Sequence, residues 1–454
     1  MELDKYIESA IKGILKNPIT QVLREIGIAK ILKQSNFVKR EVGYAPYLIF
    51  LHFIYMLVMH KRQSVFIKQS PDAFGKDVYY RFIKQTRFNW RKLLLISAEA
   101  LIQKIEPLQK TTESVVLIID DTVEQKCGKK IEGSCRHIWS NKEKRTVNGI
   151  NIVSLNYADN YSTFQIDFAV RMNKSRRKEP SGFCSNLHHR SNAFFRRNEG
   201  LQGKNTLALE MVERALKQGI YADFLLTDSW YAKPDFIAQA NNLGLPVIAR
   251  IANNDRVWHF KGEHKTLNAI YNALSKVKRH ACGTHGKIHY RYFDTVAEHR
   301  RLGKVRLLFM HTGKELLVFL STDLSLSPKA MIEIYKKRWS IEQGYKDLRE
   351  HFGLGKEENR IYEALIARIT LSMFTYNIVS YINRISHEPQ TLGELFRELE
   401  CELETLVISM HLFLQILTKI AEIENVVKKN KDLHTIIAVL GAYTQKELGF
   451  MCES

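Results

Sequence analysis

The sequence predicts an α/β protein in which a sheet-containing core is flanked by helical N- and C-terminal segments. Three observations lead to this prediction. The first part of the chain, 1–105, carries apolar residues with helical periodicity and has few Gly or Pro inside the apolar segments. The central part contains short apolar strand patterns separated by amphipathic helices. From about residue 362 onward the pattern becomes helical again.

The composition is that of a large and strongly basic globular protein. The 454 residues, 45% of them hydrophobic, are enough for at least one large core. The net charge of +20 attracts polyanions, most commonly nucleic acid and more rarely an anionic membrane surface. The longest apolar run, 47–59, is too short for a bilayer span of about 20 residues. Because no secretory signal is visible either, we expect a cytoplasmic, nucleoid-associated protein that does not contact a membrane.

The N-terminal segment 1–105 is expected to be a separate helical DNA-binding domain. Within it, the stretch 76–94 interleaves Lys and Arg with Tyr, Phe and Trp. Cations that contact phosphates beside aromatic side chains suit a DNA-binding helical unit, so Arg87 and Arg91 are candidate DNA contacts. The alternative is a solvated basic face over an aromatic core.

The central elements follow the order β-β-β-α-β-α-β. The expected strands are 114–122, 150–159, 163–171, 222–230 and 246–251, and the expected helices are 205–219 and 233–244. Acidic residues stand at the C-terminal ends of the first and fourth strands: Asp120 and Asp121 on the first, and Asp228 on the fourth. This order is typical of a ribonuclease H-like fold, and α/β sheets bind ligands at the carboxyl ends of their strands. We therefore expect a ribonuclease H-like catalytic core.

A basic stretch, 171–204, separates the third expected strand from the first helix. It carries nine Lys or Arg against two Glu, and it is long for a connection. We expect it to be a loop that contacts DNA, with Arg176, Arg177 and Lys178 as the contacting residues.

The rest of the chain divides into an insertion, a return to the core and a helical end. The mixed basic stretch 252–304 reads as a β-rich insertion subdomain, and the core then comprises 106–251 plus 305–360. The segment 361–454 is expected to form a helical C-terminal domain for dimerisation. Between residues 388 and 424 it carries eight Glu and only two cations, which suits a protein partner better than DNA.

One long helix near the end of the core has its charged residues on one side. Ser327 and Pro328 predict its N-cap and first residue, and Gly353 predicts its end. At about 100° per residue, one stripe of this helix contains Tyr335, Arg338, Glu342, Lys346 and Arg349. An apolar edge beside this stripe contains Ile334, Ile341 and Leu348. The helix should therefore pack on the sheet with its charged stripe at the border of the core.

Three carboxylates in this arrangement predict a metal-dependent phosphodiester chemistry. Two divalent ions about 4 Å apart need several carboxylate ligands, which Asp121, Asp228 and Glu342 could supply as the catalytic and metal-binding residues. Arg338 and Arg349 could then hold backbone phosphates. Any one of these acidic residues alone would be read as a local cap or ion pair. Their order along the chain, together with the matching helix, favours the metal site.

The segments "IIDDT", "LLTDSWY" and "YKKRWSIEQGYKDLR" resemble the three catalytic blocks of DDE transposases of bacterial insertion sequences, of the type with a Y-R-E-K signature and a β-strand insertion. The signature maps onto Tyr335, Arg338, Glu342 and Arg349. Its last position departs from the family, because Arg replaces Lys, and Lys346 is a competing candidate for that role. The first block of the family favours Asp121 over Asp120 as the metal ligand. The resemblance covers roughly residues 75 to 360.

The resemblance implies a cut-and-paste transposase. Its expected cofactor is Mg²⁺, as two ions for which Mn²⁺ can substitute. Its expected partners are double-stranded DNA with terminal inverted repeats and a second copy of the chain in a synaptic complex. Two rival functions are a catalytically inactive DNA-binding protein and a plain metal-dependent nuclease. The intact acidic residues argue against the first, and the additional helical domain and insertion argue against the second.

Overall fold

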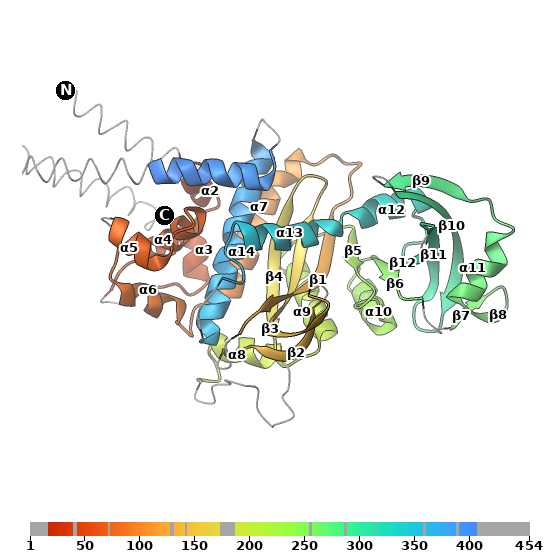
Figure 1. Ribbon diagram of the computed structural model, residues 1–454, viewed down its shortest axis with the longest axis horizontal. Coiled ribbons are helices and arrows are strands. Elements are labelled where there is room, and N and C mark those ends of the chain that lie inside the picture. The colour runs from red at the N-terminus through yellow and green to blue at the C-terminus, as the bar shows by residue number, and fades with distance from the viewer. Residues whose placement is uncertain are drawn as a thin grey trace, which may run out of the picture.

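The computed structural model describes residues 17–405, except for 40–42, 71–72, 128–130, 141–142, 173–186, 254–256, 286–287, 314, 357–359 and 387–389. It is a mixed α/β structure with one large mixed sheet, consistent with a DDE nuclease fold. Figure 1 shows N-terminal helices at one end, the central sheet in the middle and a β-rich lobe at the other end. The candidate metal-binding residues Asp121, Asp228 and Glu342 lie on the central sheet, at the end of one of its strands and on the helix that crosses it.

Five strands form the central sheet in the order β4-β3-β1-β5-β6. These strands are β1 (Val116–Gln125), β3 (Arg145–Ala158), β4 (Thr163–Arg171), β5 (Phe224–Thr227) and β6 (Val247–Ile251). β1, β3 and β4 pair antiparallel, whereas β1, β5 and β6 pair parallel. A further strand, β2 (Cys135–Ser140), pairs with the start of β3 and was not predicted from the sequence. Apart from β2 and a short helix before α9, the predicted order of strands and helices up to β6 is the observed one.

Helices cover both faces of this sheet. They include α9 (Lys204–Lys217), α10 (Pro234–Asn242), α13 (Trp339–Glu350) and α14 (Tyr362–Ile385). α9 contacts β3 and β4, while α13 contacts β1 and β4. α13 crosses the sheet close to its surface because residue 344 is glycine. A Cβ at Gly344 would lie 3.2 Å from the amide nitrogen of Gln165 on β4.

The β-rich lobe contains the expected insertion and continues the central sheet. Its elements are β7 (Val257–Phe260), β8 (Glu263–Thr266), α11 (Leu267–Ser275), β9 (Ala281–His285), β10 (Ile288–His299), β11 (Gly303–His311) and β12 (Leu316–Ser321). β12 pairs with β6, and β10 pairs with both β11 and β9. β11 and β12, which were expected to belong to the core, therefore join the strands of the insertion to the core sheet (Figure 1).

The N-terminal helices share their hydrophobic core with the sheet. They are α2 (Pro18–Glu25), α3 (Ile28–Gln34), α4 (Pro46–Val58), α5 (Gln63–Gln69), α6 (Lys76–Ile83) and α7 (Trp90–Ile105). α14 contacts α2, α4, α6 and α7 as well as β4. α14 is long and apolar enough to cross a membrane, but 94% of its apolar window is buried inside the protein, so it serves as a core helix. The DNA-binding and dimerisation roles assigned to the two helical ends stay predictions, and 406–454 lie outside the described residues.

The long helix predicted from residue 328 is divided into two. α12 (Pro328–Lys336) is followed by a turn at residues 337–338 and then by α13. The predicted ends are confirmed: the Ser327 side chain accepts a hydrogen bond from the Ala330 amide at 3.2 Å, and Gly353 has a φ of 73°. The apolar edge is also confirmed, because Ile334, Ile341 and Leu348 are buried. A short helix that was not predicted, α8 (Asn192–Gly200), lies in the second half of the basic stretch.

Candidate functional site

The acidic ends of β1 and β5 lie side by side. The two strands pair in parallel as far as Ile119 and Thr227, so the next residues are Asp120 on β1 and Asp228 directly after β5. The Asp228 carboxylate accepts hydrogen bonds from the backbone amides of Trp230 at 2.9 Å and Tyr231 at 3.2 Å. These bonds fix the turn after β5 and hold Asp228 at the edge of the sheet.

Helix α13 faces the even-numbered side chains of β1. Arg338, at the start of α13, donates to Glu342 at 2.5 Å and to Asp120 at 3.5 Å. Near the other end of the helix, Arg349 donates to Glu124 at 2.9 Å and also contacts Thr122. Since alternate residues of a strand share one face, these contacts place Asp120 on the face that α13 covers. The Arg338 guanidinium thus connects the Glu342 carboxylate on α13 with the Asp120 carboxylate on β1.

Asp121 points to the opposite face of the sheet, contrary to the expectation that it is the carboxylate that meets Glu342. It accepts hydrogen bonds from Lys204 on α9 at 2.6 Å, from Asn151 at 2.9 Å and from the Tyr231 hydroxyl at 3.1 Å. The reason is the strand register, because neighbouring residues of a strand alternate between faces. Arg338 therefore contacts Asp120 and Glu342 and interacts electrostatically with Asp228, whereas Asp121 is directed toward α9.

Asp120 and Asp228 lie close enough to repel each other, and both carboxyls are partly buried. Burial raises the pKa of the Asp120 carboxyl to about 7, and repulsion from Asp228 and Asp121 adds to this shift. Burial also raises the pKa of Asp228. Carboxylates that repel one another in this way are suited to a divalent cation, whose preferred ligands are oxygens.

The carboxylates are not gathered into a finished metal-binding cluster. Among the described residues, no three His, Cys, Asp or Glu side chains form a group that could hold a metal ion. Arg338 contacts both Asp120 and Glu342 and supplies the positive charge between them. The donor chemistry fits a divalent ion, and direct ligation by both carboxylates would require Arg338 to move.

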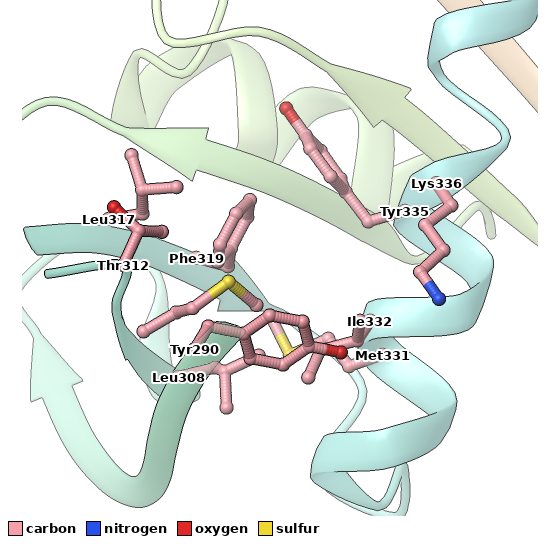
Figure 2. A pocket seen from close by; sticks show the side chains of 10 residues that line it. Tyr290, Leu308, Thr312, Leu317, Phe319, Met331, Ile332, Tyr335 and Lys336 are labelled. Carbon is pink, nitrogen blue, oxygen red and sulfur yellow. The ribbon is translucent and has the colours of Figure 1, made fainter. Parts of the chain in front are cut away.

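The other residues of the charged stripe divide into buried and exposed ones. Tyr335 donates from its hydroxyl to the carbonyl of Thr227 at 3.1 Å, and burial raises the pKa of its phenol to about 12. Its ring forms part of the wall of an apolar pocket of about 190 Å³ between α12 and strands β10, β11 and β12, where it contacts Phe319 (Figure 2). The Arg349 guanidinium is held by its contacts with Glu124 and Thr122 on β1, whereas the Lys346 side chain is exposed.

The expected N-terminal DNA contacts have structural partners. Arg91 donates to Asp167 at 3.0 Å and also contacts Glu199, and its side chain is only 18% exposed. This buried ion-pair cluster explains Arg91 better than a phosphate contact does. Arg87 is partly buried and donates to the carbonyl of Val38 at 3.2 Å. Arg176, Arg177 and Lys178 lie outside the described residues.

Two features, one beside Asp228 and one in α8, were missed by the sequence reasoning. Trp230 follows Asp228 by two residues and is 44% exposed, with the amines of Lys204 and Lys233 each 4.7 Å from its ring centre. In the sequence, Trp230 could have been found from its position in the segment "TDSWY", close to the candidate Asp228. In addition, Arg197, which was counted as part of a DNA-contacting loop, is fully buried in α8.

Comparison with known proteins gives two family matches, which together span the three acidic residues. A family model described as DDE superfamily endonuclease matches residues 56–267, and one described as Transposase DDE domain matches residues 195–378. The first match contains Asp120 and Asp228, and the second contains Asp228 and Glu342. No curated protein matches the sequence. The two matches support a DDE transposase-family protein with nuclease or transposase activity, and they suggest that it binds DNA.

Proposed function

We propose that this chain is a DNA transposase that cuts the ends of an insertion sequence and joins them to target DNA. The observation that carries the proposal is that Arg338 contacts both Asp120 and Glu342 and interacts electrostatically with Asp228. These residues come from the three segments that resemble the catalytic blocks of the Y-R-E-K type. The observed strand order β4-β3-β1-β5-β6 supports a ribonuclease H-like core as the scaffold.

Asp120, Asp228 and Glu342 would hold the divalent ions, with Asp120 in the place first given to Asp121. Two bound Mg²⁺ ions, or Mn²⁺ in their place, would activate the attacking oxygen and stabilise the leaving oxygen of a phosphodiester. Arg338 neutralises the carboxylates of Asp120 and Glu342 and is placed to contact a phosphate once it leaves them.

The substrate we propose is double-stranded DNA that carries the terminal inverted repeats of the element. The net charge of +20 supports a polyanionic substrate. Exposed Trp230, with Lys204 and Lys233 beside it, offers an aromatic surface and two cations next to Asp228. A second copy of the chain would hold the other end of the element in a synaptic complex.

The test is cleavage and joining of DNA that carries the inverted repeats flanking the gene. Glu342→Gln and Asp228→Asn should each lower strand cleavage in Mg²⁺ by orders of magnitude while DNA binding persists. Lys217→Gln, a change on an exposed surface of α9, is the control and should cleave like the wild type. Wild-type cleavage by Glu342→Gln would refute the proposal. Cleavage without any joining would indicate a nuclease instead.

A comparison of neighbouring variants tests the assignment of the first carboxylate. Asp120→Asn should abolish cleavage because Asp120 faces α13. Asp121→Asn should leave more activity, because it changes a side chain that is bonded to Lys204 and Asn151. Loss of activity in Asp121→Asn with activity retained in Asp120→Asn would restore the assignment made from the sequence.

A further inference from the structure

A cationic cavity lies away from the carboxylates, where α4, α5 and α6 meet the ends of α13 and α14. Its volume is about 820 Å³. We call it the basic cavity, because its lining includes His60, Lys61, Arg62, Lys76, Lys356 and Arg368. No acidic residue lines it within the described part of the chain. A cavity lined by this set of charges is suited to an anion.

Three of these cations are available to an incoming ligand. Arg62, Lys76 and Lys356 are exposed, come from three separate segments, and form no ion pair within the part of the chain that the structure describes. Lys61, by contrast, pairs with Glu404 at 3.3 Å. A solvent-exposed cluster of like charges is unfavourable unless counter-ions or a ligand neutralise it, so the cavity favours a polyanion over a neutral molecule.

Arg368 is held in position from the core side of the cavity. It belongs to α14, whose apolar window is 94% buried, and its guanidinium lies 4.8 Å from the centre of the Phe53 ring. It also donates to the side-chain oxygen of Gln63 at 3.5 Å. A stacked guanidinium loses little further side-chain freedom when it binds an anion, which makes it suited to phosphate recognition.

The surplus positive charge also affects a neighbouring histidine. Burial lowers the pKa of His351, and the positive charges of Arg397 and Lys356 lower it further, although Glu350 acts in the opposite direction. His351 is the residue that follows the end of α13, so this effect shows that the positive field extends to the same helix that carries Glu342.

Helix α13 connects the basic cavity with the carboxylates. From Glu342 to Glu350, the last residue of the helix, the chain advances eight residues, or about 12 Å at 1.5 Å per residue. Gly353, with a φ of 73°, then turns the chain so that Phe352, Gly353 and Lys356 line the cavity. Exposed Lys346 lies between the two places on the same helix.

We propose that the basic cavity binds the phosphodiester backbone of the DNA duplex whose end is cut at the carboxylates. This inference rests on the proposed function, because it takes DNA as the polyanion. With base pairs about 3.4 Å apart, the 12 Å of α13 correspond to roughly four base pairs, so the bound phosphates belong to the same duplex as the cut and lie several base pairs from it. The cavity thus holds the duplex, while the carboxylates act on one bond.

The test compares two triple variants with the same change in net charge. The cavity variant is Arg62→Gln, Lys76→Gln and Lys356→Gln. The control variant is Lys217→Gln, Lys261→Gln and Lys276→Gln, whose side chains are exposed elsewhere on the protein. Fluorescence anisotropy with a labelled duplex of about 30 base pairs, across a series of salt concentrations, gives the slope of log affinity against log salt for each protein.

Each lost phosphate contact should reduce the slope by about 0.9, so the cavity variant should lose about 2 to 3 in slope. The control variant should keep the wild-type slope. An unchanged slope in the cavity variant, or an equal loss in the control, would overturn the inference. A duplex RNA of the same length that binds more tightly than DNA, through the same three residues, would also overturn it.

A second measurement uses the unaltered protein and is independent of the folding of any variant. DNA should protect Lys76 and Lys356 from an amine-acylating reagent, as read by mass spectrometry, while Lys217 should stay reactive. Equal acylation of Lys76 and Lys356 with and without DNA would contradict the inference.

The two proposals fail in different ways. A protein that binds the duplex through the basic cavity but never cleaves DNA retains the cavity inference and loses the proposed function. A protein that cleaves and joins the element ends, with a salt slope unaffected in the cavity variant, retains the proposed function and loses the cavity inference.

Discussion

Replacing Arg197 with methionine is expected to be one of the most destabilising single substitutions in this protein. The Arg197 side chain is 1% exposed and donates to Glu132 at 2.5 Å and to both oxygens of Glu363 at 2.6 and 2.9 Å. A further bond, at 3.2 Å, goes to the carbonyl of Ala193 within α8. Arg197 therefore joins α8, the loop before β2 and the first turn of α14.

The magnitude follows from what Arg197→Met leaves behind. The side chains of Glu132 and Glu363 are only 9% and 7% exposed, so their two carboxylates would face each other without a cation and with little water. Removing one partner of a buried ion pair typically costs about 3–5 kcal/mol of stability. We expect a loss in this range, because the methionine retains the apolar volume but none of the four hydrogen bonds.

Urea unfolding followed by circular dichroism measures this loss as a change in the free energy of unfolding. Lys217→Ala is the matched control: its pair with Glu213 is also formed by a helical cation, but the lysine is 72% exposed, so the change should cost at most about 0.5 kcal/mol. The double variant Arg197→Met with Glu363→Gln should recover part of the stability by removing one stranded charge. A loss below about 1 kcal/mol for Arg197→Met would refute the reasoning that Arg197 is a buried charge on which both glutamates depend.

The remaining predictions concern acid stability, helix packing and metal. Arg91 and Arg214 overcome the effect of burial and lower the pKa of Asp167 to about 2, so Asp167 contributes stability that is present above about pH 4 and lost as the pH falls through 2. Urea titrations of wild type and Asp167→Asn should show their difference shrinking by about 2 kcal/mol over that interval, and a constant difference would contradict this. Gly344→Val should impair cleavage more than DNA binding, because its side chain would press on Gln165 and lift α13; equal activity in a cleavage assay would show that the packing tolerates it. Removal of divalent metal with EDTA should stop cleavage without preventing DNA binding, and Mg²⁺ or Mn²⁺ should restore it; cleavage that continues in EDTA would exclude the proposed ions.

Features encoded by neighbouring residues could be predicted from the sequence. β4 was predicted at 163–171, where it is observed, and Ser327 and Gly353 were predicted as the ends of a helical segment. These features depend on strand periodicity, on a side-chain cap and on a backbone conformation that glycine adopts easily, all of which are local. The three acidic segments could also be identified from local patterns, because each lies at the end of a predicted strand or on one side of a predicted helix.

The details that escaped prediction depend on partners that are distant in sequence. The choice between Asp120 and Asp121 is decided by which helix covers which face of β1, and α13 lies more than two hundred residues away. Arg91 was predicted to contact DNA because its partner Asp167, 76 residues later, could not be identified from the sequence. The α8 helix was an exception, because Ser191 provides a local N-cap that could have been recognised inside the basic stretch.

The pairing of β6 with β12 limits how this protein can be shortened. β6 bonds to β5 on one side and to β12 on the other, so its backbone amides and carbonyls are used along both edges. Deleting the β-rich lobe would remove β12 and leave one edge of β6 without a partner strand. An apolar strand with an open edge is a template for pairing with another molecule, and such edges promote aggregation. We therefore expect a chain without the lobe to aggregate unless β12 is replaced with a charged or proline-containing edge.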